Sequence, residues 1–312
     1  MSIQLVSLTP TAALGIPIAI IGSIFLALGA QFQHRGVNKV DAATAPEDKA
    51  GLNVRQLFLL ARRPSWLIGT LLLTLAIVLQ LLSLYLAPLT VVQPLGAIAL
   101  VITSVVNARV SHTPLDGPSI RAIAFCVGGV GIFVTVAALT TTSVPIHDVQ
   151  LVVVLVILAV VLVIAALSFA FFRKKASMIY YIVGAGILFG FVATLAKVII
   201  DRAHTIVQNG FHLHPGDVLT VVCLVGLILA GLLGSYFVQT AYSSGPPDLV
   251  VAGLTVIDPL VGVTIGIVVL GEAQGAPLWA GIVFVVSGAL AIYGVFSLSK
   301  YHPQTRRQGM LD

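Results

Sequence analysis

The sequence predicts an all-α polytopic membrane protein with nine transmembrane helices in an inverted repeat of four plus five. Three observations support this fold class. Of the 312 residues, 58% are hydrophobic and only 9% are charged, whereas soluble domains carry about a quarter charged residues. The apolar residues gather into runs of about 20, the length that crosses a bilayer. One heptapeptide occurs twice, once in each half of the chain.

Nine apolar runs are long enough to be spans, and the first is expected to stay in the membrane. No Lys or Arg precedes Arg35, whereas a cleaved secretory signal begins with a positive segment. The fifth run has no glycine between Leu151 and Phe172 and is expected to face lipid. The predicted spans lie near residues 12–33, 66–86, 90–108, 121–140, 150–172, 179–200, 218–242, 249–270 and 277–299.

The basic residues predict the orientation in the membrane. When loop 34–63 is placed inside, every lysine and arginine except Lys197 and Arg202 falls on that side, which the positive-inside rule assigns to the cytoplasm. The N-terminus is then outside and the C-terminus inside, in the plasma membrane of a bacterium. Because these residues follow the ends of apolar runs, the net charge of +5 does not indicate nucleic-acid binding.

The repeated heptapeptide divides the chain into two halves. Residues 1–145 contain four helices and loop 34–63, residues 146–300 contain five helices, and residues 301–312 form a basic cytoplasmic tail. The copies, LTVVQPL at 89–95 and LTVIDPL at 254–260, fall in the third and eighth spans, which run in opposite directions. Inverted repeats are typical of secondary transporters, whose substrate sites lie where broken helices meet. We expect helix breaks at Pro94 and Pro259, because proline removes a backbone donor.

Asp258 and Gln93 precede these two prolines and are the first candidate binding residues. Asp258 lies near the middle of its span, where an aspartate costs about 2.5–3.5 kcal/mol to insert. One interpretation makes Asp258 a cation or proton site, and the other makes it a neutral cap of a broken helix. Gln93 would add a neutral donor and acceptor to the same cavity.

Four further polar residues are candidates for substrate or ion binding. Lys197 lies near the end of its span and is expected to reach the outer surface and pair with Asp201, the alternative being an inward counter-ion. Glu272 either caps the turn that follows it or collects cations, so a metal site would draw on Asp258 and Glu272. Asn107 and Gln239 are polar residues within or at the ends of spans.

The remaining reactive side chains indicate no catalytic site. Cys126 and Cys223 lie inside predicted helices and are expected to be small core residues. His212 and His214 have a spacing that allows weak zinc binding, but solvated loop histidines are the expected alternative. The chain has no recognised enzyme motif, so we expect neither enzyme activity nor a cofactor.

Several of these residues resemble the drug/metabolite transporter superfamily, its EamA-like group and, within it, the NIPA-type magnesium transporters. The resemblance covers most of residues 12–298 and implies a nine-helix bundle with the N-terminus outside. Two features depart from the family pattern: Val106-Asn107 stands where Gly-Glu is expected, and Asp258 precedes the second proline. The matching segments are Ala87-Pro88, Val92-Gln93-Pro94-Leu95-Gly96, Asp258-Pro259-Leu260 and Leu270-Gly271-Glu272.

Three functions are consistent with the sequence. The leading hypothesis is a secondary transporter that moves a small metabolite or ion by alternating access, with Asp258 as the coupling carboxylate. The second, implied by the resemblance, is a NIPA-like transporter of Mg²⁺. The third is a lipid flippase or a scaffold of envelope synthesis. The expected partners are the lipid bilayer and a small-molecule or ion substrate, and the sequence leaves a homodimer open.

Overall fold

The computed structural model describes residues 10–41, 62–110, 116–172, 177–208, 217–244 and 247–301. These residues form helices joined by short connections, and no strand occurs among them. Most of loop 34–63, most of the tail 301–312, and His212 and His214 lie outside the described residues. The helices are α1 (Pro10–Asp41), α3 (Pro64–Leu86), α4 (Leu89–Leu95), α5 (Ala97–Val110), α6 (Gly117–Thr140), α7 (Asp148–Phe172), α8 (Met178–Gln208), α9 (Asp217–Ser244), α10 (Pro247–Val268) and α11 (Leu278–Tyr301).

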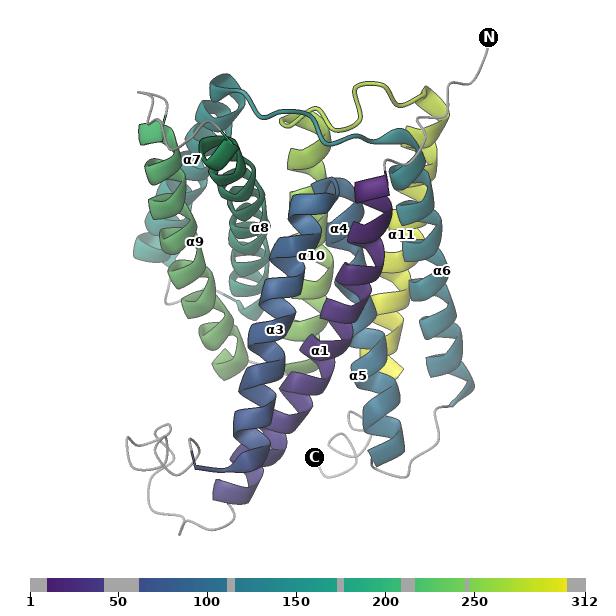
Figure 1. Cartoon of the computed structure of the whole chain (residues 1–312). Helices are drawn as coiled ribbons and strands as arrows, with labels where there is room; N and C mark the ends of the chain where they lie inside the picture. Colours follow the sequence, from purple (N-terminus) through teal and green to yellow (C-terminus); the bar gives the residue numbers. More distant parts are fainter. Residues whose placement is uncertain are drawn as a thin grey trace.

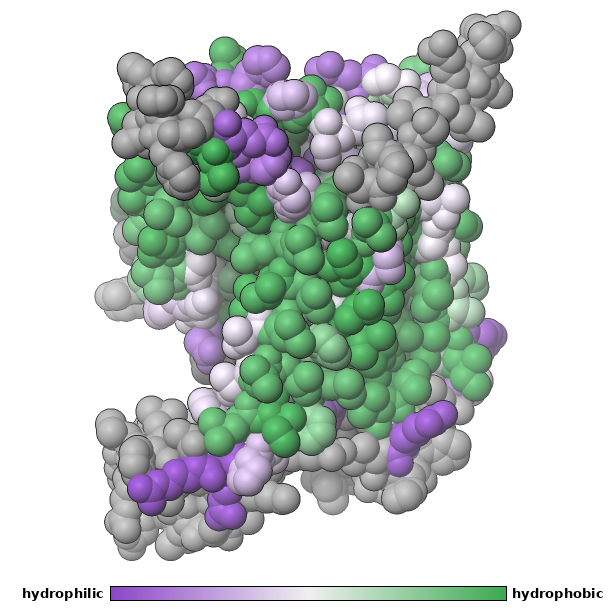
Figure 2. All heavy atoms as spheres, viewed as in Figure 1, coloured by the Kyte–Doolittle hydropathy of each residue, from purple (hydrophilic) through white to green (hydrophobic). Residues whose placement is uncertain are grey.

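Nine spans of the described chain are long and apolar enough to cross a membrane, with α4 and α5 sharing the span Leu89–Val106. The prediction of an all-α, nine-span membrane protein is therefore confirmed. The spans alternate in direction, so α1 begins at the upper end of the bundle and α11 ends at the lower end (Figure 1). Apolar side chains cover the middle of the surface, and hydrophilic ones gather toward the two ends (Figure 2).

The described basic residues are sorted between the two ends of the bundle. Arg62 and Arg63 precede α3, Arg109 lies in the last turn of α5 and Arg121 near the start of α6, all at the lower end in Figure 1. Lys197 and Arg202 lie in the later part of α8, toward the upper end. The positive-inside rule assigns the lower end to the cytoplasm, and this orientation stays a prediction.

The helices pack in pairs that recur in the two halves. α1 lies along α3 and α5, and α8 lies along α9 and α10. Gly15 allows the close approach of α1 to α3, since a Cβ built on it would lie 2.6 Å from the Cβ of Ala87. α6 packs along α11, and α10 contacts both α4 and α8. The recurring pairs agree with two related halves, and the inversion between them stays a prediction.

The outer position predicted for the fifth span is confirmed. α7 has the smallest buried share of the nine spans. Apolar side chains stand exposed along its length, including Val149, Val156 and Leu167. In a membrane protein these side chains face lipid rather than water.

The predicted helix breaks are found in only one of the two copies. The first copy is interrupted after Leu95, where the Gly96 N–H donates to the carbonyl of Gln93 at 3.1 Å. The expected break at Pro259 is wrong, because α10 continues through this residue. Pro259 removes one backbone donor, but α8 packs closely on both sides of it. A Cβ on Gly186 or Gly190 of α8 would lie 2.6 Å from the Cβ of Ile257 or Val261.

Candidate functional site

Gln93 and Asp258 mark the crossing of α4 and α10. The Gln93 side chain is buried against α10 because Gly262 leaves room for it: a Cβ on Gly262 would lie 2.9 Å from Gln93 Nε2. Asp258 precedes Gly262 by one helical turn and so lies on the same face of α10. Gln93 Nε2 and Asp258 Oδ1 are both buried, and neither has a hydrogen-bond partner among the described residues.

This unpaired donor and this unpaired acceptor determine what the crossing can bind. A buried polar group without a partner costs about 1–3 kcal/mol, and buried polar groups in native proteins are nearly always paired. A proton bound to Asp258 would remove the charge from the buried carboxylate. A water molecule or a polar group of a solute would satisfy Gln93. The crossing is therefore suited to binding a small polar group or a proton.

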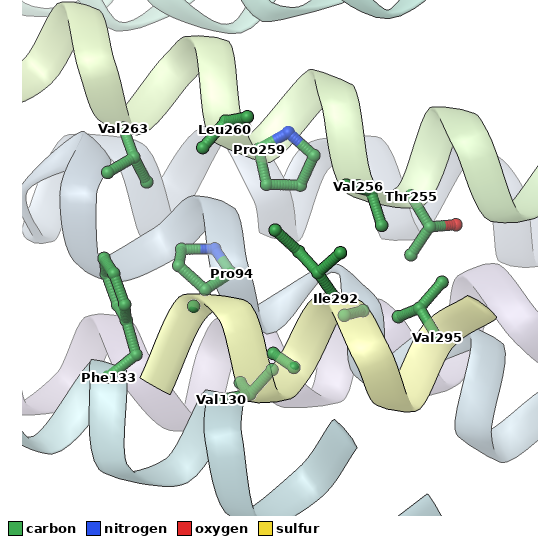
Figure 3. Close-up of a pocket in the computed structure, with 13 residues that line it drawn as sticks. Pro94, Val130, Phe133, Thr255, Val256, Pro259, Leu260, Val263, Ile292 and Val295 are labelled. Atoms are coloured by element: carbon green, nitrogen blue, oxygen red, sulfur yellow. The ribbon is translucent and has the colours of Figure 1, made fainter. Parts of the chain in front are cut away.

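An apolar pocket with a cavity volume of about 80 Å³ lies on another side of the same helix crossing. Both prolines of the repeated heptapeptide, Pro94 and Pro259, face it (Figure 3). α6 and α11 supply further wall residues such as Phe133 and Ile292. Thr255 is the only polar residue in the lining, so the pocket is suited to an apolar group.

Glu272 connects the end of α10 to the start of α4. It follows Gly271, whose φ of 75° is left-handed and favours glycine. One carboxylate oxygen accepts from the Leu89 N–H at 2.7 Å, and the other accepts from the Thr90 N–H at 2.8 Å and the Thr90 hydroxyl at 2.5 Å. Its carbonyl accepts from the N–H of Thr142. Glu272 is thus a buried helix cap, but of α4 rather than of its own turn.

Burial raises the pKa of Glu272 above its ordinary value. Its hydrogen bonds to Thr90 and Leu89 and the nearby charge of Lys197 act in the opposite direction. The elevated pKa results from desolvation, which disfavours the charged form of a carboxyl group.

Lys197 points into the protein rather than to the surface. Its side chain is buried, and Nζ donates to the carbonyl of Leu84 at 2.6 Å. The expected salt bridge with Asp201 is present, with Nζ 3.3 Å from Oδ1. The expectation that Lys197 reaches the outer surface is wrong, because the Leu84 carbonyl near the end of α3 provides a buried acceptor. Lys197 therefore joins α8 to α3 on the side where Glu272 joins α10 to α4.

The other candidate residues do not join these contacts. Gln239 is exposed on α9, and the side chain of Asn107 lies outside the described residues. No group of three His, Cys, Asp or Glu side chains able to hold a metal ion occurs within the ranges that the structure describes. Cys126 and Cys223 are free and buried, as expected.

Two functional features were missed by reasoning from the sequence. Thr90 supplies both a backbone and a side-chain donor to Glu272, and its counterpart in the second heptapeptide, Thr255, lines the pocket. Their shared position in the repeat is a signal that would have identified both. The pocket walls on α6 and α11 had no such signal, because they are ordinary apolar residues of long apolar helices.

Comparisons with known proteins show one relative over nearly the whole chain. An uncharacterized protein of Corynebacterium glutamicum is 27% identical over 292 residues, which are 92% of this chain and 95% of that protein. No protein-family model matches the chain, and no solved structure matches it. The relative shows that a bacterium carries a protein of similar length and sequence.

Proposed function

We propose that this multi-pass membrane protein is a secondary transporter of the drug/metabolite transporter kind, and that it moves a small solute past the crossing of α4 and α10. The observation that carries the proposal is the juxtaposition at this crossing. An apolar pocket is faced by Pro94 and Pro259, and the residues just before them, Gln93 and Asp258, hold unpaired buried polar atoms. Intramembrane ionisable residues commonly mark transport pathways and proton relays.

The lining of the pocket favours an apolar or amphipathic solute. Its walls offer methyl, methylene and ring surface, so an apolar part of the solute would bind there. A charged or polar part would reach toward Gln93 and Asp258. Asp258 would couple transport to proton movement, since one carboxylate can hold either a proton or a cationic group.

Transport of Mg²⁺ is the less favoured alternative. Mg²⁺ requires oxygen ligands in near-octahedral geometry and keeps several waters. Both oxygens of Glu272 already accept hydrogen bonds from the start of α4, so this carboxylate is not free to collect cations at the outer end. The apolar pocket offers a hydrated cation few partners.

Reconstituted full-length protein provides the test. Proteoliposomes with an internal pH dye would be given a proton gradient, and uptake of tetraphenylphosphonium, an apolar cation, would be compared with uptake of Mg²⁺. We expect gradient-driven uptake of the apolar cation and its loss in Asp258→Asn. Asp148→Asn, a substitution at an exposed carboxylate of α7, is the matched control. Unchanged coupled uptake in Asp258→Asn would remove the coupling role.

Two glycines of α11 provide a matched test of the pocket itself. A Cβ on Gly288 or on Gly281 would meet nothing within 4 Å, but only Gly288 lines the pocket. Gly288→Leu should fill the pocket and reduce uptake, whereas Gly281→Leu should transport like the native protein. Equal uptake by the two variants would show that the pocket is not on the path of the solute.

A further inference from the structure

A second pocket lies in the groove between α6 and α11 at the opposite end of the bundle from Glu272. It is open on one side, has a cavity volume of about 150 Å³ and is lined by Pro118, Arg121, Ala122, Phe125, Tyr293 and Ser297. The α6 residues are spaced along one face of the helix, and Tyr293 and Ser297 are one turn apart on α11. The two helices nearly touch beside it, since a Cβ on Gly294 would lie 2.4 Å from the backbone N of Cys126.

The α6–α11 pocket contains three polar side chains. It combines a guanidinium from Arg121, a phenol from Tyr293 and a hydroxyl from Ser297. Arg121 and Tyr293 are exposed. None of the three side chains has a hydrogen bond or ion pair with any residue that the structure describes. Five N–H donors in a fixed plane make arginine well matched to a phosphate group.

The position of the pocket identifies the kind of phosphate. Arg121 lies one turn after the start of α6, and Ser297 lies one turn before the end of α11, so both sit near the end of a membrane span. The other side of the pocket is aromatic, with Phe125 and Tyr293 in an edge-to-face contact at 5.5 Å between ring centroids. Aromatic side chains are typical of the depth at which headgroups meet acyl chains.

From these contacts we propose that the α6–α11 pocket binds the headgroup of an anionic phospholipid of the cytoplasmic leaflet. The Arg121 guanidinium pairs with the phosphodiester, and the Tyr293 and Ser297 hydroxyls donate to its oxygens. Phe125 contacts the start of the acyl chains. The same face of α6 continues past Phe125 with Gly128 and the exposed Ile132, which gives the chains an apolar surface.

Native mass spectrometry of the full chain in mixed micelles would count bound phosphatidylglycerol against phosphatidylcholine. We expect phosphatidylglycerol to bind the native protein, and Arg121→Gln to weaken it by about tenfold or more, since a charge-assisted pair is lost. Arg109→Gln removes an exposed charge at the same end outside the pocket and should leave binding nearly unchanged. Tyr293→Phe, which keeps the ring but removes the hydroxyl, should cause a smaller loss.

Three results would overturn the proposal. One is equal binding of phosphatidylglycerol by Arg121→Gln and Arg109→Gln, and another is equal binding of phosphatidylcholine and phosphatidylglycerol by the native protein. The third is displacement of the lipid by millimolar inorganic phosphate, which would identify a free phosphate site. The transport proposal does not depend on this pocket, so either can fail without the other.

Discussion

Replacing Glu272 tests whether the start of α4 is held by the turn after α10. The carboxylate accepts three hydrogen bonds, from the Leu89 N–H, the Thr90 N–H and the Thr90 hydroxyl. Hydrogen bonds to charged groups contribute about 1.5–3 kcal/mol each, but the desolvation of a buried carboxylate offsets part of the sum. We therefore expect Glu272→Ala to lower the free energy of unfolding by about 3–5 kcal/mol, as for a broken buried charge pair.

Two milder substitutions separate the contributions. The amide in Glu272→Gln keeps one acceptor oxygen but turns an NH₂ group toward the donors of α4, so a loss of about 1.5–3 kcal/mol is expected. Thr90→Val removes only the hydroxyl donor, with an expected loss of about 1–2 kcal/mol. The double variant should lose less than the sum of the two single losses, because the residues share one interaction.

Unfolding in mixed micelles with increasing dodecyl sulfate, followed by tryptophan fluorescence, would measure these losses. The chain has two tryptophans, Trp66 at the start of α3 and Trp279 at the start of α11, so the signal reports both ends of the bundle. Gln274→Ala changes an exposed side chain in the same turn and serves as the control. If Glu272→Ala unfolds at the same detergent fraction as Gln274→Ala, the cap does not stabilise the fold.

Further predictions concern the helix contacts, the buried lysine and the effect of pH. Gly129→Ala should destabilise the protein strongly, since the new Cβ would lie 2.5 Å from a backbone nitrogen of α11. Gly128→Ala, whose new Cβ would meet nothing within 4 Å, should be neutral or stabilising. Equal unfolding midpoints of the two variants would refute the observed α6–α11 contact. Lys197→Met should lower the free energy of unfolding by about 1–3 kcal/mol in the same titration, because the Leu84 carbonyl and Asp201 lose their donor. Adding Asp201→Asn should recover part of this loss. An unfolding midpoint of Lys197→Met equal to that of the native protein would contradict the buried position of Lys197. Because the pKa of Glu272 is raised in the folded protein, the folded state holds the proton more tightly than the unfolded chain. Stability should therefore be fully present below the ordinary pKa and fall as pH rises through the raised one. Thermal unfolding of Glu272→Gln should lack this slope, and identical slopes in the two proteins would rule out Glu272 as its source.

The membrane architecture could be predicted from the sequence because it depends on local composition. Each span must satisfy its backbone internally and be apolar along its length, and both properties can be seen in a window of about 20 residues. The lipid-facing position of α7 follows for the same reason, since a run of Val, Leu, Ile and Ala without glycine offers no close packing surface.

The contacts of the polar residues could not be predicted, because their partners are distant in the sequence. Glu272 and Leu89 are 183 residues apart, and Lys197 and Leu84 are 113 apart. The acceptor for Lys197 is a backbone carbonyl, which no residue type reveals. The break at Pro259 was mispredicted because glycines on the neighbouring α8 allow packing that keeps α10 continuous, and these glycines belong to another helix.

The two heptapeptides differ in the contacts that fix them in the bundle as well as in charge. The first is fixed at its start by three hydrogen bonds that Leu89 and Thr90 donate to Glu272, whereas the second, which carries Asp258, lies within a continuous helix packed on α8. Under alternating access, α4 and the end of α10 cannot separate on the Glu272 side until these hydrogen bonds break. Burial on this side raises the pKa of Glu272, so the closed arrangement binds the proton more tightly than an open one in which the carboxyl group meets water. Opening on that side should therefore become easier as pH rises through the raised pKa. The carboxyl groups associated with the two copies would then respond to the same proton gradient, one at the crossing and one at the contact between α4 and the turn after α10.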